Sequence, residues 1–89
     1  MIVRKRLVFR GSVQGVGFRY RARYAAAAQG CTGWCRNDWD GSVTMEIQGE
    51  PEQIDRVILS IQNGRWVEIR GMEARSLPVI EGERGFRAE

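Results

Sequence analysis

A glycine-rich segment followed directly by an arginine is the part of the chain whose residue types best suit chemistry. Residues 11–17 read Gly-Ser-Val-Gln-Gly-Val-Gly, and Phe18 and Arg19 come next. Glycines permit positive φ and close approach of a ligand to the backbone. A helix beginning at Phe18 would add unpaired N–H groups and partial positive charge. The segment predicts a site for phosphate or a similar anion, although a tight turn beside an ordinary surface arginine would give the same pattern.

The same segment differs from the common nucleotide-binding motifs. Phe18 and Arg19 follow the glycines where a P-loop has Lys-Ser or Lys-Thr, and Tyr20 stands where a dinucleotide loop has its third glycine. The chain has no His, and Cys31 and Cys35 without a carboxylate cluster are too few to hold structural zinc. The sequence therefore predicts no metal and disfavours nucleotide binding. The two cysteines lie on an extended stretch, which places them too far apart for a disulfide, and we expect free thiols.

Strands and helices that would position the segment can be read from side-chain periodicity and from glycine and proline signals. In residues 4–13, Leu7, Phe9 and Val13 fall on one side, as in a strand with one buried face. Gly30 and Asn63-Gly64 are helix-stop signals. The expected elements are strands over 4–13, 31–37, 42–48 and 67–77, helices over 18–29 and 51–62, and a short last strand at Phe86, with Asp40-Gly41 as a hairpin turn.

The order βαββαβ, with a fifth strand possible at the end, predicts an α+β ferredoxin-like sandwich. We expect one antiparallel sheet of four to five strands with both helices on one face, and a single domain over residues 1–89. Arg70-Gly71 is expected to form a β-bulge, because the alternation changes phase there. Trp34 is expected in the core, and an arginine stripe of Arg4, Arg6 and Arg10 on a solvated sheet face.

Net charge gives only a weak indication of partners. Fourteen basic and eleven acidic residues leave a formal charge of +3, which favours anions but is also explained by a solvated surface. RNA-recognition domains share this topology and need exposed aromatic residues on the central strands. The outward positions Thr44, Glu46 and Gln48 supply none, so nucleic acid is disfavoured.

No segment is long and apolar enough to span a membrane, and the start Met-Ile-Val-Arg-Lys-Arg puts charge before a signal-peptide core could form. The sequence predicts a cytoplasmic protein. A monomer is expected because no second apolar face is evident.

Two motifs carry a family resemblance. The run from Arg10 to Arg19, Arg-Gly-Ser-Val-Gln-Gly-Val-Gly-Phe-Arg, resembles the signature of acylphosphatases. Gly33-Trp-Cys-Arg-Asn37, followed by Asp40-Gly-Ser-Val43, resembles the second signature of that family. The spacing between the two also fits, and the resemblance extends over nearly the whole chain.

The resemblance implies a βαββαβ enzyme without a cofactor that hydrolyses small acyl phosphates to a carboxylate and inorganic phosphate. The phosphate would then also be a product or inhibitor that binds the site. By resemblance Arg19 and Asn37 are the catalytic pair, with Asn37 orienting the attacking water. The phosphate-binding residues implied are Gly15, Val16, Gly17, Phe18 and Arg19.

Departures from the family pattern affect packing more than catalysis. Cys35 stands where an apolar β-branched residue is usual, and Ala88 where a larger apolar residue is common. Asp38 adds negative charge beside an anion site, which would weaken anion binding. Two alternatives remain. One is a non-catalytic anion- or RNA-binding ferredoxin-like module. The other is a detached counterpart of the acylphosphatase-like domain in larger carbamoyl-transferring maturation proteins, and the free-standing length of the chain argues against it.

Overall fold

A computed structural model describes all of residues 1–89. The elements are β1 (Val3–Ser12), α1 (Phe18–Gln29), β2 (Thr32–Asn37), β3 (Val43–Gly49), α2 (Pro51–Gln62), β4 (Glu68–Leu77) and β5 (Phe86–Ala88). The expected βαββαβ order and the short last strand are confirmed, with boundaries that differ by a residue or so.

The five strands form one sheet in the order β4-β1-β3-β2-β5. The pairs formed by β1, β2, β3 and β4 are antiparallel, but β5 pairs with β2 in parallel. The sheet is therefore mixed and not wholly antiparallel as the sequence suggested. The chain crosses from β4 at one edge of the sheet to the far edge, where β5 runs opposite to β4 and therefore in the same direction as its neighbour β2.

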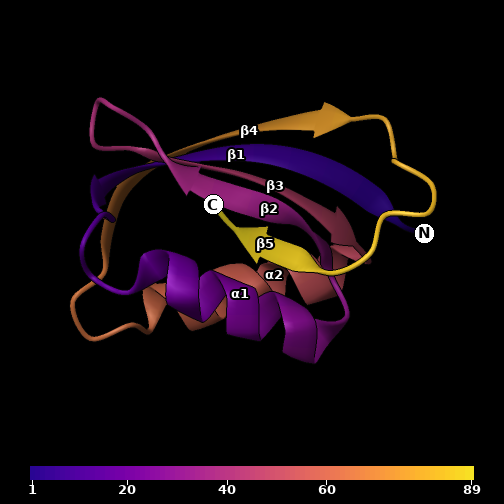
Figure 1. Cartoon of the computed structure of the whole chain (residues 1–89), viewed down its shortest axis with the longest axis horizontal. Coiled ribbons are helices and arrows are strands. Elements are labelled where there is room, and N and C mark those ends of the chain that lie inside the picture. Colours follow the sequence, from indigo (N-terminus) through magenta and orange to yellow (C-terminus); the bar gives the residue numbers. More distant parts are fainter.

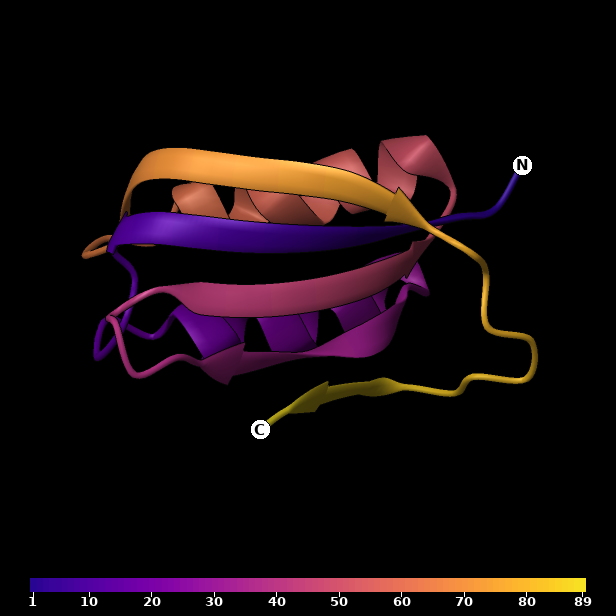
Figure 2. The same cartoon turned by 90° about the horizontal axis from the view of Figure 1, so that it is seen from above.

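Both helices cover the same face of the sheet, which arches over them (Figure 1), and the view from above shows them side by side behind the strands (Figure 2). The core lies between these layers. Its fully buried side chains come from alternate strand positions and from one stripe of each helix: Leu7, Phe9, Val43, Met45, Ile47, Phe18, Ala22, Ala26, Ile54, Val57 and Ile61. These are the period-two and helical spacings read from the sequence.

The helices begin and end at identifiable residues. Gly30 ends α1 in the left-handed conformation, with φ of 73°. A capping box between Glu50 and Gln53, together with Pro51 in the first turn, starts α2. Because α1 begins at Phe18, directly after the glycine segment, its N-terminus lies at the same end of the sheet as the β2–β3 hairpin (Figure 1).

The expected bulge lies where β1 meets β4. Arg10 faces Gly71 but Gly11 faces Ile69, so Arg70 is the extra residue on β4. A Cβ on Gly11 would lie 2.3 Å from the backbone oxygen of Glu68, so the close approach of the two strands there requires glycine.

The outer face of the sheet differs from expectation at two positions. Arg4 is buried, at 2% exposure, because Glu46 and Glu83 enclose its guanidinium; it is not part of a solvated stripe. Trp34 lies opposite Glu46, outside the core, and is half-buried with the Arg36 guanidinium 5.1 Å from its ring centroid. Its place follows from strand register, because the core positions of β2 are Gly33 and Cys35.

Candidate active site

The glycine segment forms the loop between β1 and α1. Gly15 and Gly17 have φ of 70° and 83°, and Gly17 is the N-cap of α1. No backbone N–H from Gly15 to Gly17 donates to another group of the chain, and the first α1 hydrogen bond runs from Arg21 N–H to the Gly17 carbonyl. The loop and the first helical turn thus present a run of free donors, which is the arrangement that binds an oxyanion.

Arg19 lies in the first turn of α1 and is half-buried. One of its Nη1 hydrogens is donated to the backbone oxygen of Glu89, just after β5. The backbone N–H of Glu89 in turn donates to the Cys35 carbonyl at 2.8 Å, so the end of β5 is fixed to β2. This contact holds one side of the guanidinium and leaves its other donors free for a ligand.

Asn37 is the last residue of β2 and is exposed. Its side chain makes no hydrogen bond within the chain, while the neighbouring Asp38 N–H donates to the Ser42 carbonyl to close the hairpin. Alternation along β2 puts Asn37 on the same face as the buried Gly33 and Cys35, which is the face that carries the helices. A free amide therefore lies beside the N-terminus of α1.

These residues surround one hollow of about 160 Å³. Its lining consists of Val13, Gly15, Gly17, Phe18, Arg19, Tyr20 and Asn37. Of the residues predicted to bind phosphate or catalyse, only Val16 is absent from the lining, because its side chain packs against the core. The Phe18 ring is also turned inward, 4.9 Å from the Phe9 ring, so only its backbone can serve a ligand.

Sequence reasoning assigned no role to Gln14, which links the loop to the hairpin. Its Nε2 donates to the backbone oxygens of Asp38 at 2.7 Å and Ser42 at 2.8 Å. One side-chain amide thereby connects the phosphate-type loop to the strand end that carries Asn37. The only sequence signal was an amide residue inside a glycine segment, since the partners lie more than twenty residues away.

Asp38 does not place its charge at the hollow. Its carboxylate accepts hydrogen bonds from Thr44 Oγ1 at 2.6 Å, Ser42 Oγ at 3.1 Å and Arg36 Nε at 3.2 Å. Partial burial alone would raise the pKa of Asp38, but these hydrogen bonds outweigh it and hold the pKa below its usual range. The carboxylate braces the hairpin, and its ion pair with Arg36 offsets part of its negative charge.

Cys35 lies beneath the site and is fully buried. Burial raises its pKa to about 12, against a smaller lowering by the charge of Arg19. At neutral pH it is a thiol and not a thiolate, so it is not an activated nucleophile. Both cysteines are free, as the sequence predicted.

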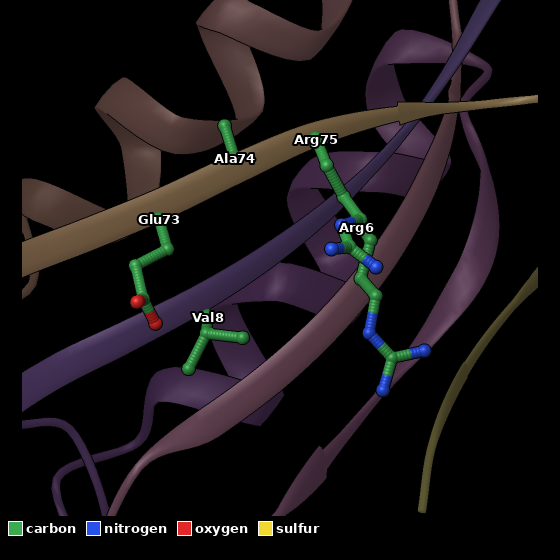
Figure 3. Close-up of a pocket in the computed structure, with 5 residues that line it drawn as sticks. All are labelled: Arg6, Val8, Glu73, Ala74 and Arg75. Atoms are coloured by element: carbon green, nitrogen blue, oxygen red, sulfur yellow. The ribbon is translucent and has the colours of Figure 1, made fainter.

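A larger hollow of about 340 Å³ lies on the outer face of the sheet. Figure 3 shows Arg6, Val8, Glu73 and Arg75 around it. Arg6 pairs with Glu46 at 2.9 Å and Glu73 with Arg10 at 3.1 Å, so much of its charge is already neutralised. It has no helix N-terminus and no free loop amides, and we therefore place the candidate site at the smaller hollow.

No group of three or more His, Cys, Asp or Glu side chains is arranged to hold a metal ion. No helix combines the length and the apolar character needed to cross a membrane.

The fold defines the chain as an α+β sandwich of the ferredoxin-like class. Its structure matches the crystal structure of an acylphosphatase from Bacillus subtilis with a TM-score of 0.88 and 27% identity, covering 100% of this chain and 99% of that one. An acylphosphatase of Bifidobacterium longum is 40% identical over 90% of this chain and 84% of its own length. One of Clostridium beijerinckii is 34% identical over 96% of both chains.

The acylphosphatase family model matches residues 5–88. The chain belongs to the acylphosphatase family, and it is an enzyme of the class that hydrolyses acyl phosphates.

Proposed function

We propose that this chain hydrolyses the carboxyl-phosphate bond of small acyl phosphates at the hollow between the β1–α1 loop and the end of β2. The observation that carries the proposal is the convergence of free loop amides, the Arg19 guanidinium and the free Asn37 amide on one small hollow. The backbone amides from Gly15 to Arg19, here called the phosphate cradle, hold the phosphate oxygens. Arg19 adds charge-assisted hydrogen bonds to the same group.

Asn37 orients the attacking water. Its amide can both donate and accept a hydrogen bond, and it is a poor base. The water oxygen forms a bond to phosphorus as the bond from phosphorus to the acyl oxygen breaks, and the carboxylate leaves with the electron pair. The water proton passes to a phosphate oxygen. A carboxylate is a good leaving group, so positioning and charge stabilisation suffice without a strong base.

The acid-base groups around the hollow favour this direct route. Cys35 is protonated at neutral pH and buried, and Asp38 is held by the hairpin. Neither is available as a nucleophile. Trapping a covalent phosphoenzyme during turnover would contradict direct attack by water.

The test is phosphate release from acetyl phosphate and benzoyl phosphate in EDTA. Arg19→Ala and Asn37→Ala are each expected to lower kcat/KM by about 100-fold or more, as loss of a transition-state donor does. Arg19→Ala should also weaken inhibition by inorganic phosphate, whereas Asn37→Ala should lower kcat and leave phosphate inhibition nearly unchanged, because Asn37 contacts the water.

Matched controls are Arg23→Ala and Asn63→Ala, which remove the same side chains at exposed positions outside the hollow. Both should retain parental kcat/KM. An inactive parent, or folded Arg19 and Asn37 variants with parental activity, would contradict the proposal.

A further inference from the structure

The residues assigned above hold the phosphate but leave the acyl group without a contact. One aromatic side chain of the lining is exposed: Tyr20, the third residue of α1, is 67% accessible. Phe18, the other aromatic of the lining, is 1% exposed and packs against Phe9. Among the residues that line the hollow, Tyr20 is therefore the one that offers an exposed aromatic surface to a ligand.

The Tyr20 ring is supported from behind by Tyr24. The two ring centroids are 4.7 Å apart with 46° between the planes, the contact expected for residues four apart on a helix. Tyr24 does not line the hollow. Its ring covers part of one face of Tyr20 and favours the Tyr20 rotamer in which the two rings touch.

Size and chemistry suit this ring to an acyl group. The hollow of about 160 Å³ is lined by the loop glycines, Arg19 and Tyr20, and it is small enough that an acyl phosphate held by the loop amides would extend its acyl group out of it. Tyr20 follows Arg19 directly in the first turn of the helix, and it gives that rim a flat and largely apolar wall. A flat aromatic acyl group can pack against such a wall, whereas a methyl group covers little of it.

We propose that Tyr20, supported by Tyr24, is a specificity-determining residue that contacts the acyl group and favours acyl phosphates with flat aromatic acyl groups over acetyl phosphate. The inference rests on the proposed function, because it places the phosphate in the cradle. The inference adds a preference for one class of substrate, because the phosphate cradle alone does not distinguish between acyl groups.

Trp39 is the rival aromatic near the site. It follows Asn37 by two residues in the β2–β3 turn and is 99% exposed. It is outside the lining and makes no aromatic contact. Nothing in the chain orders its ring, and it therefore serves as the matched control.

The experiment compares kcat/KM for benzoyl phosphate and acetyl phosphate in the parent, Tyr20→Ala, Tyr20→Phe and Trp39→Ala, each checked for folding by circular dichroism. Tyr20→Ala should lower the benzoyl-to-acetyl ratio of kcat/KM by about three- to tenfold, the worth of one aromatic contact. Its kcat/KM for acetyl phosphate should fall by less than its kcat/KM for benzoyl phosphate. Tyr20→Phe should preserve the ratio because the ring remains, and Trp39→Ala should leave it unchanged.

An unchanged ratio in Tyr20→Ala, or an equal fall in Trp39→Ala, would overturn the assignment of Tyr20 while hydrolysis of both substrates still upheld the proposed function. A parent that hydrolyses neither substrate would overturn both. A parallel fall on both substrates in Tyr20→Ala would mean that the residue acts on the phosphate site and not on the acyl group, which also overturns the inference.

Discussion

The side-chain amide of Gln14 donates a hydrogen bond of 2.7 Å to the backbone oxygen of Asp38, and so joins the glycine loop to the residue that follows Asn37. A second bond of 2.8 Å reaches Ser42 across the same hairpin. The two halves of the site come from separate segments, and this amide joins residues 24 positions apart in the chain. The distance between the loop amides and the Asn37 amide therefore depends in part on it.

Gln14→Ala is therefore expected to lower kcat/KM by about 10- to 100-fold, since a displacement near 1 Å of a positioning group can cost that much. The fold should remain, with a loss of about 1 to 3 kcal/mol because two carbonyl oxygens lose a donor. Steady-state kinetics and urea denaturation measure the two effects. Gln62→Ala, at an exposed position of α2, is the control, and equal activity in both variants would remove the linking role of Gln14.

The two glycines at the ends of α1 allow the effect of backbone strain to be separated from an effect on ligand binding. Gly17 and Gly30 have φ of 83° and 73°, and a Cβ at either position would meet no atom within 4 Å. Alanine at each should cost about 1 to 2 kcal/mol from the left-handed backbone alone. Only Gly17→Ala should also weaken inhibition by inorganic phosphate, because it shifts amides of the cradle. Thermal unfolding and phosphate inhibition of both variants check this, and similar phosphate inhibition in the two would mean that the loop amides do not bind the anion.

The sequence was most informative where the signal is local. Gly30 ends α1 because glycine enters the left-handed region at low cost, and the alternation of Val43, Met45 and Ile47 predicts the buried face of β3. The close spacing of Gly15, Gly17 and Arg19 likewise indicates a run of free N–H donors, because the loop and the first turn of the helix that supply these donors are adjacent in the sequence.

What the sequence did not reveal depends on distant pairings. Arg4 is buried because Glu83, 79 residues away, returns over the sheet. Trp34 faces outward because of its register with Glu46, and β5 is parallel to β2 because of the path of the chain after β4. The link made by Gln14 belongs to the same group. Periodicity within one segment carries no information about such contacts.

The buried thiol of Cys35 should be chemically silent. Because burial raises its pKa to about 12, with Arg19 opposing only in part, the thiolate is scarce at pH 8. Iodoacetamide should leave the folded enzyme active and unmodified by mass spectrometry, and should modify it only in denaturant. Cys35→Val should retain activity and change stability by less than about 1.5 kcal/mol, as near-isosteric core substitutions do. Rapid inactivation of the folded enzyme by the reagent would show that this thiol is accessible and ionised.

Glu83 should make stability depend on pH. Partial burial would raise its pKa, but hydrogen bonds from Arg4 at 2.7 Å and Thr32 at 2.7 Å outweigh this and lower it. A carboxyl whose folded pKa is depressed stabilises the fold above its unfolded pKa, and the contribution is lost as pH falls through the folded value. Glu83→Gln should thus cost about 1 to 3 kcal/mol at pH 7, the range for hydrogen bonds to charged groups.

The cost of Glu83→Gln should shrink once the pH falls below about 4.3, where the carboxyl of the unfolded chain takes up its proton. Urea denaturation at pH 7 and pH 3 measures the difference. The exposed Glu81→Gln is the control, because Glu81 has no ion-pair partner. A cost that is the same at both pH values would mean that the ionised Glu83 carboxylate does not stabilise the loop that leads to β5. The placement of Glu89 against Arg19 would then depend on the pairing of β5 with β2 alone.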